Sequence, residues 1–231
     1  MSRLEAFSGD DLRRFGDAIR AIATQAATME ESANRIADVL WDGLPGDCAL
    51  IRVYKTHPYG KLPPDLRAFA AAIGGDLGDD VRCLTLLATR GVEPAWNDRR
   101  LSDGHKAIPL PSVAFVQRLP MVAGLIHQLG LELSDVVRPE RGKVIELAQR
   151  TYGVFHVPAA RGSEFVPAQD FVERFGIVSA LGFGGVLFTG DFFAVVVFAR
   201  VPVDERVADT VRVLSLSTRV ALLPFGTRVF S

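Results

Sequence analysis

The fold of this chain is decided by residues 177–199, IVSALGFGGVLFTGDFFAVVVFA. The stretch is apolar and long enough to span a bilayer, and Asp191 is its only charged residue. Its centre, residues 189–191 (TGD), is a turn signal. Because β-branched and aromatic residues are enriched on both sides of that turn, the stretch predicts a hairpin of two buried strands rather than a membrane-spanning or buried helix.

Glycines surround Phe183 inside the first predicted strand of the hairpin, in residues 182–185 (GFGG). Phosphate-binding loops of the Rossmann and P-loop types need a helix N-terminus directly after their glycines, whereas these glycines lie within a strand. They therefore indicate a bulge or a close approach of two backbones. Such an approach could also serve a ligand.

The N-terminal part of the chain has apolar residues at alternating spacings of three and four, which is the a/d pattern of an amphipathic helix. These residues are Leu12, Phe15, Ile19, Ile22, Ala26, Met29, Ala33, Ile36 and Leu40. Ser8 and Thr28 can cap helices, and each is followed three positions later by an acidic residue. The pattern therefore predicts one long helix, or two helices with a break near Ala27. Its apolar stripe is either a dimer seam or the face that packs on the chain's own sheet.

The rest of the chain mixes short strands and helices without a regular β-α-β repeat. Strands are predicted at residues 48–55, 81–89 and 153–158, and helices at 62–73, 120–130, 141–150 and 204–222. Together with the tight hairpin, this order predicts an α+β fold, with a single antiparallel sheet flanked by helices and with amphipathic helices at the N- and C-terminal ends.

Charge and cysteine content limit the function classes. The chain has 231 residues, of which 26 are basic and 27 acidic, and its formal net charge is -1. This balance argues against a large electrostatic surface for nucleic acid or an anionic membrane, so we expect neither as a partner. The charged N-terminus is not a secretory signal, and two cysteines make no disulfide framework. We therefore expect a reducing, cytoplasmic setting.

Residues 29–55 (MEESANRIADVLWDGLPGDCALIRVYK) predict a helix that leads into a strand, and residues 176–222 predict two strands followed by a helix. These two segments resemble the entry helix and first strand, and the last two strands and final helix, of the GAF family of sensory domains, which are relatives of PAS domains. The resemblance implies a helical extension over residues 1–27, a GAF-like domain over residues 28–223 and a C-terminal tail over residues 224–231.

Three further stretches are similar to the N-terminal sensory regions of bacterial multidomain histidine kinases that carry PAS modules. They are residues 96–112 (WNDRRLSDGHKAIPLPS), 155–169 (FHVPAARGSEFVPAQ) and 175–185 (FGIVSALGFGG). This similarity implies a signalling context, with a histidine kinase or another signalling output domain as a partner, but it supplies no ligand.

The sequence shows no motif for a metal site or a catalytic residue. Its histidines and cysteines lack ligand spacing, and it contains no nucleophile elbow. Cys83 lies in an apolar strand, where cysteine usually acts as a small hydrophobic residue. Some GAF-like enzymes, the free methionine sulfoxide reductases, use several cysteines, so a cysteine redox enzyme is one alternative function. The other is a dimerisation module without a ligand.

A small ligand is expected between the sheet and two loops, residues 93–105 and 155–169. The first loop combines aromatic, charged, hydroxyl, amide and imidazole groups, and it is either a binding loop or a solvated loop held by Trp96. The predicted lining residues are Trp96, His105, His156 and Phe183. The cofactor is not specified, and ligation of haem by a histidine stays open. The expected function is a non-catalytic sensory module that forms a homodimer through its N- and C-terminal helices.

Overall fold

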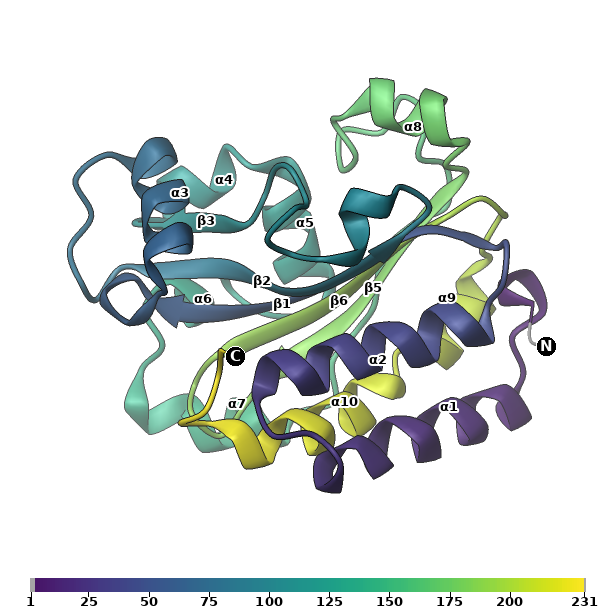
Figure 1. Ribbon diagram of the computed structural model, residues 1–231, viewed down its shortest axis with the longest axis horizontal. Coiled ribbons are helices and arrows are strands. Elements are labelled where there is room, and N and C mark those ends of the chain that lie inside the picture. Colours follow the sequence, from purple (N-terminus) through teal and green to yellow (C-terminus); the bar gives the residue numbers. More distant parts are fainter. Residues whose placement is uncertain (1–2, 231) are drawn as a thin grey trace.

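The computed structural model, which describes residues 3–230, contains one six-stranded antiparallel sheet (Figure 1). Its strands are β1 (Cys48–Pro58), β2 (Arg82–Gly91), β3 (Ala107–Leu110), β4 (Phe155–Val157), β5 (Ser179–Val186) and β6 (Phe192–Ala199). The strand order is β3-β2-β1-β6-β5-β4, so the first and last long strands pair at the centre. Helices cover both faces of the sheet, which confirms the predicted α+β fold class.

The hairpin predicted at residues 177–199 is formed by β5 and β6. Its turn places Gly190 at a φ of +79°, a conformation that favours glycine. The two strands approach closely at Gly184, where an added Cβ would lie 2.2 Å from the carbonyl oxygen of Phe193. This confirms that the glycines of β5 serve a close backbone approach.

One face of the sheet, which we call the helical face, is covered by the terminal helices. These are α1 (Gly9–Ala21), α2 (Met29–Gly43), α9 (Glu205–Val211) and α10 (Leu214–Leu222). In Figure 1, α2 crosses in front of the sheet, and α10 and α1 lie below it. Ser8 and Thr28 cap α1 and α2 as expected, and a short 3-10 turn (Ile22–Thr24) separates the two helices. The apolar stripe of the N-terminal helices is buried within the chain's own core.

The opposite face, which we call the loop face, is covered by short helices and their connections. The helices are α4 (Val113–Gln117), α5 (Pro120–Gln128), α6 (Leu133–Val137), α7 (Val144–Gln149) and α8 (Gln169–Phe175). They enclose a second apolar core with Leu125 and Phe155 at its centre. A third, smaller core lies at the sheet edge, where α3 (Pro64–Gly74) packs against β3.

The structure differs from the predicted elements at several places, among them the unpredicted seven-residue helix α8. β3 was not predicted, because it has four residues and contains Pro109, which is tolerated only on an edge strand. α6 was not predicted either, since it has only five residues. The single helix expected at residues 204–222 is wrong: two helices meet at Val213, where the N–H groups of Ser215 and Leu216 each bond a carbonyl three residues back.

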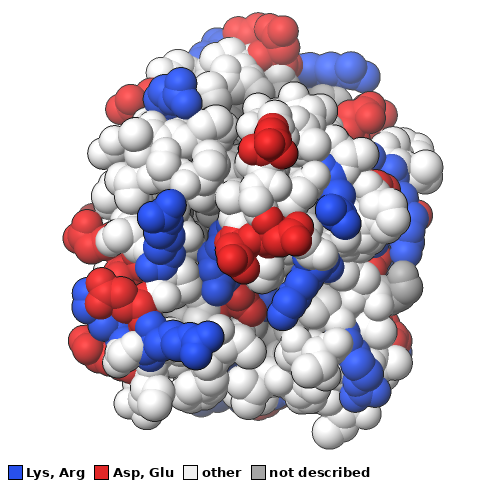
Figure 2. Space-filling view, turned by 90° about the vertical axis from the view of Figure 1, so that its left-hand side faces the viewer, with Lys and Arg blue, Asp and Glu red and all other residues white. Residues whose placement is uncertain are grey.

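Residues 1–2 and 231, at the ends of the expected extension and tail, lie outside the described residues. Among residues 3–230 there is no helix whose length and apolar character would suit a bilayer crossing. Basic and acidic side chains are interspersed over the face shown in Figure 2, and this agrees with the formal net charge of -1.

Candidate functional site

The loop face of β1 carries a buried arginine. On this face β1 presents Leu50, Arg52 and Tyr54, as the alternation of a strand requires. Arg52 lies opposite Val196 of β6, and only 7% of it is exposed. Because helices and loops cover this face, the charge of Arg52 leaves bulk water when the chain folds.

The guanidinium of Arg52 meets only uncharged oxygens. Its Nη1 donates to the Tyr54 hydroxyl at 3.2 Å, and its Nη2 donates to the Ser102 hydroxyl at 3.1 Å. The main-chain carbonyls of Asp103 and Gly104 accept at 3.3 and 3.5 Å. The Nε has no hydrogen-bond partner. Within residues 3–230, Arg52 forms no ion pair with a carboxylate.

Thr89 lies directly across the β1–β2 ladder from Arg52, so the two side chains share one face of the sheet. The Thr89 side chain is fully buried, and its Oγ1 has no hydrogen-bond partner. Buried polar groups in folded proteins are normally satisfied. Two unsatisfied groups on neighbouring strands therefore mark this part of the loop face as an incomplete polar site.

Residues 98–105, which we call the roof loop, cover Arg52 (teal in Figure 1). Arg99 ties the start of this loop to α2, because its Nε and Nη2 donate to the two carboxylate oxygens of Glu30 at 2.7 and 3.2 Å. At the end of the loop, Gly104 and His105 have φ angles of +71° and +55°. Histidine is among the few non-glycine residues found in this left-handed region.

His105, one of the four predicted lining residues, lies at the protein surface at the end of the roof loop. Desolvation by neighbouring atoms, and then the positive charge of Arg52, lower the pKa of the His105 imidazole. The neutral form is therefore favoured, and a neutral imidazole can both donate and accept a hydrogen bond. His105 directly follows Gly104, whose carbonyl accepts a hydrogen bond from Arg52.

Trp96, the second predicted residue, belongs to an aromatic group on the loop face. Its ring centroid lies 4.6 Å from that of Phe175 and 5.8 Å from that of Phe171, both in α8. Phe171 in turn makes an edge-to-face contact with Phe198 of β6 at 5.1 Å. Trp96, which precedes the roof loop, therefore packs against α8. Phe198 is the next residue of β6 on this face after Val196, which pairs with Arg52.

His156 and Phe183 face the other side of the sheet. Phe183 is fully buried in the core beneath the terminal helices. The Nε2 of His156 lies 2.7 Å from the carbonyl oxygen of Val203, which is a satisfied structural contact near α9. The structure therefore brings Trp96 and His105 to the loop face and does not bring His156 or Phe183 to them.

Sequence reasoning missed Arg52, Thr89 and Ser102. The alternation of Ile51 and Val53 with Arg52 and Tyr54 predicts a strand, but it does not by itself predict that Arg52 is buried. A signal was nevertheless present, because helices were predicted in numbers sufficient to cover both faces of one sheet. An arginine in the middle of a strand covered on both sides must be buried.

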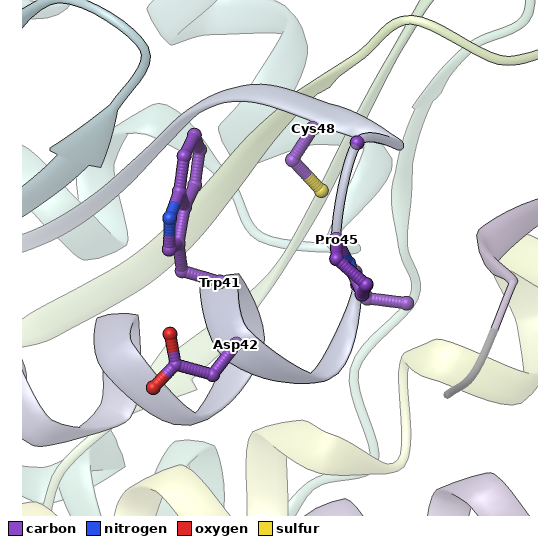
Figure 3. A pocket seen from close by; sticks show the side chains of 6 residues that line it. Trp41, Asp42, Pro45 and Cys48 are labelled. Atoms are coloured by element: carbon purple, nitrogen blue, oxygen red, sulfur yellow. The ribbon is translucent and has the colours of Figure 1, made fainter.

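Two surface hollows lie away from Arg52. One, of about 260 Å³, lies where α2 leads into β1 and is lined by Trp41, Asp42, Leu44, Pro45, Gly46 and Cys48 (Figure 3). Burial, and then Asp47, raise the pKa of the Cys48 thiol to about 12, so its nucleophilic thiolate form is disfavoured. The other hollow, of about 480 Å³, lies on α9 and is lined by Glu205, Arg206, Asp209 and Thr210.

The second cysteine, Cys83, is also buried. Burial raises the pKa of the Cys83 thiol to about 12. Among residues 3–230 the structure holds no group of three or more histidine, cysteine or acidic side chains placed to bind a metal ion. What the site around Arg52 offers chemically is a desolvated positive charge beside hydroxyl groups.

No family model matches the sequence. No curated protein matches it either. Among solved structures, the chain is similar to the GAF domain of the Acinetobacter phosphoenolpyruvate-protein phosphotransferase, with 14% identity and a TM-score of 0.43 over 94% of each chain.

Two further structures illustrate the range of the likeness. The phycoerythrobilin-bound GAF domain of a cyanobacterial phytochrome has 11% identity and a TM-score of 0.45, over 92% of this chain and 94% of that chain. The N-acylhomoserine lactone-dependent LuxR-family transcription factor CepR2 of Burkholderia cenocepacia has 10% identity and a TM-score of 0.40, over 92% and 93%. The GAF likeness expected from the sequence is present among solved structures, at identities that carry no ligand, activity or partner over to this chain.

Proposed function

We propose that this chain is a non-catalytic sensory or regulatory module that binds a small ligand on the loop face. The observation that carries the proposal is the pair of unsatisfied buried groups, Arg52 Nε and Thr89 Oγ1, on adjacent strands. Leaving one such group unpaired costs about 1–3 kcal/mol. A ligand that pairs them recovers this free energy, whereas a site with no ligand would be more stable with apolar residues.

Trp96 and His105 border this site and remain in its proposed lining. His156 and Phe183 would contribute only to a ligand bound from the helical face, since their side chains lie there. The proposed site is therefore centred on Arg52 and bounded by the roof loop. No residue in it is assigned a catalytic role.

The proposed signalling surface is an exposed apolar stripe on the last helix. Its residues are Val213, Leu216, Val220 and Leu223, each 39–57% exposed. They recur at spacings of three and four along α10 and the two residues that flank it, which is the pattern of a helix that packs on another helix. We propose that two copies of the chain pair through α10, because the corresponding stripe of the N-terminal helices is already buried inside the chain.

A physical route connects the ligand site to this helix. The roof loop is held to α2 by the Arg99–Glu30 ion pair. α2 in turn contacts α10, where the Ser32 hydroxyl donates to the Ala221 carbonyl at 2.9 Å. If the roof loop, α2 and α10 can pack in two arrangements, a ligand that binds one arrangement more tightly would increase the population of that arrangement. A histidine kinase or another output domain in the cytoplasm is the proposed recipient.

Two other functions are weighed against this one. A cysteine redox enzyme is disfavoured because both thiols are buried and their pKa values are raised to about 12. A dimerisation module without a ligand is favoured by the α10 stripe taken alone. Only the unsatisfied groups at Arg52 and Thr89 favour a ligand-binding module over it.

Native mass spectrometry of the purified protein, with an absorbance scan from about 250 to 700 nm, tests the proposal. We expect a dimer that carries, or takes up, a small molecule, and a Soret band would identify that molecule as haem. A dimer that takes up no small molecule under any condition would leave the dimerisation module as the function. A turnover of methionine sulfoxide that requires Cys83 would establish the redox enzyme instead.

A further inference from the structure

We propose that Arg52 anchors the anionic group of a small amphipathic ligand, a carboxylate or a phosphate, between β1 and the roof loop. The inference rests on the proposed function and adds the chemistry of its ligand. It follows from four features of the described residues: an uncompensated charge, long hydrogen bonds, unused hydroxyl groups and a neighbouring aromatic group.

Within the described part of the chain, Arg52 differs from the other buried cations of the sheet and the roof loop in having no carboxylate partner, a property that it shares with Arg219 of α10. Lys55 lies 2.7 Å from a carboxylate oxygen of Asp191, and Arg99 lies 2.7 Å from one of Glu30. Arg52 is comparably buried but meets only hydroxyls and carbonyls. Since buried charges are normally paired, the missing counter-ion is expected from outside the chain.

The hydrogen bonds of Arg52 are long for a cation. They measure 3.1–3.5 Å, whereas charge-assisted bonds from nitrogen to an anionic oxygen measure about 2.7–2.9 Å. An anionic oxygen that replaced the carbonyls of Asp103 and Gly104 as acceptor would therefore form shorter and stronger hydrogen bonds with Arg52. The planar fork of an arginine side chain fits the paired oxygens of a carboxylate or phosphate.

Hydroxyl groups around Arg52 can complete the anion site. Thr89 Oγ1 has no partner and lies on the same face, directly across the ladder. Ser102 and Tyr54 present their hydroxyl oxygens to the guanidinium, and each keeps a rotatable hydrogen for another acceptor. An anion at Arg52 would thus receive hydrogen bonds from both the strand ladder and the roof loop.

The apolar part of the ligand would lie toward the aromatic group. Leu50 and Phe198 occupy the next positions on this face beyond the Arg52–Val196 pair. Phe198 contacts Phe171, which contacts Trp96. The surface along these contacts is therefore polar and charged at Arg52 and apolar and aromatic at Trp96. Such a surface fits an organic acid with an aromatic or aliphatic body better than a free inorganic ion.

Entry to the site requires the roof loop to open. Ser102, Asp103 and Gly104 cover the guanidinium, and the left-handed residues Gly104 and His105 form the end of the loop. Arg99 fixes the beginning of the loop to α2. Opening at the Gly104–His105 end would expose Arg52 while leaving the anchor on α2 in place.

Tryptophan fluorescence can test this assignment, because Trp96 lies near the site and Trp41 lies at the distant hollow. In a Trp41→Phe variant, the emission of Trp96 is measured while phenylacetate, phenyl phosphate or the neutral benzyl alcohol is added. We expect a saturable change with at least one acid and none with the alcohol. The acid that binds tells whether the natural group is a carboxylate or a phosphate.

Variants at Arg52 test whether this residue causes the fluorescence change on addition of the acid. Arg52→Met should weaken binding of the acid by about 30-fold or more, because a buried charge pair is lost. Arg52→Lys keeps the charge without the fork and should bind with intermediate affinity. Arg219→Met is the matched control: it is a buried arginine that lies over the Tyr152 ring and donates to the Ala148 carbonyl, and its loss should leave binding unchanged.

The outcomes separate this inference from the proposed function. If no acid produces a saturable change, or if Arg52→Met binds the acid as tightly as the parent does, the anion site is wrong. The proposed function would survive that result if native mass spectrometry still showed uptake of a small molecule. Should Arg52→Met fail to fold, equal binding by Arg52→Lys and by the parent would overturn the bidentate anchor.

Discussion

Arg99 of the roof loop and Glu30 of α2 form a two-point ion pair that is almost completely buried, with side chains 4% and 3% exposed. Asp65 of α3 adds a second carboxylate at 3.2 Å from Arg99, and the Phe230 ring lies 5.5 Å from the guanidinium. The pair therefore joins the roof loop, two helices and the C-terminal segment at a single point.

Substitution of Glu30 by glutamine should destabilise the protein strongly. Removing one partner of a buried ion pair typically costs about 3–5 kcal/mol, and the half-exposed Asp65, which lies 3.2 Å from Arg99, should offset part of that loss. Urea unfolding followed by circular dichroism measures the loss. Asp10→Asn, which removes an exposed pair with Arg13, is the control and should change stability by less than about 1 kcal/mol. A Glu30→Gln variant as stable as this control would show that Arg99 finds its main support elsewhere.

His57 should make the protein sensitive to mild acid. Burial, and then the charge of Lys55, lower the pKa of the His57 imidazole to about 3, below its usual value of 6.5. Between these two values the unfolded chain binds a proton that the folded chain does not. The free energy of unfolding should therefore fall as the pH drops from about 6.5 toward 3, by up to about 1.4 kcal/mol per pH unit from this group.

His57→Leu separates this contribution from those of the acidic residues. Neither ring nitrogen of His57 has a hydrogen-bond partner, so the apolar side chain should be tolerated near neutral pH. Stability measured in urea at pH 7, 6, 5 and 4 should fall less steeply for His57→Leu than for the parent. The exposed residue His127 supplies the comparison, because His127→Leu removes a histidine that is not buried. If the free energy of unfolding fell equally steeply with decreasing pH in all three proteins, His57 would be excluded as the cause of the acid sensitivity.

Elements with a strong local pattern were predictable, and those set by long-range packing were not. The hairpin and the capped helices α1 and α2 follow from turn chemistry, strand composition and heptad spacing within short windows. β3 depends on pairing with β2, and its four residues carry no pattern of their own. The same contrast holds at the site. Trp96 and His105 stand out in the sequence as unusual side chains in a loop, whereas Arg52 becomes unusual only once both faces of its strand are covered.

The sequence also did not show which face of the sheet each strand side chain would lie on. His156 and Phe183 were predicted to line the ligand site with Trp96, but a strand alternates its side chains between faces. Which face receives the ligand depends on the helices that cover each side, and short windows of sequence do not carry that information. In the structure, Leu181 opposes His156 across the β4–β5 ladder, and both Leu181 and Phe183 lie in the core of the helical face.

Gly184→Ala should disturb the centre of the sheet. The added methyl group would lie 2.2 Å from the main-chain oxygen of Phe193, so one of the two paired strands must move. Overpacking of this kind costs about 1–3 kcal/mol. Thermal unfolding would detect it, and Gly78→Ala serves as the control, since a Cβ there has no heavy atom within 4 Å. If both variants unfolded at the same temperature as the parent, the β5 and β6 backbones would be able to move apart at Gly184 without loss of stability.

The exposed stripe of α10 predicts that the chain forms a dimer through this helix. Leu216 is 57% exposed near the middle of the stripe, so a glutamate there should be tolerated by the monomer. In a dimer that pairs through α10, the same change would bring two like charges into an apolar interface, which is strongly unfavourable. Sedimentation equilibrium should therefore show a dimer for the parent and a monomer for Leu216→Glu, with unchanged circular dichroism. Leu101→Glu, at a leucine of the roof loop that is at least as exposed as Leu216, should remain dimeric. A Leu216→Glu protein that stays dimeric would move the interface away from α10, and the route from the roof loop through α2 would then need a different endpoint.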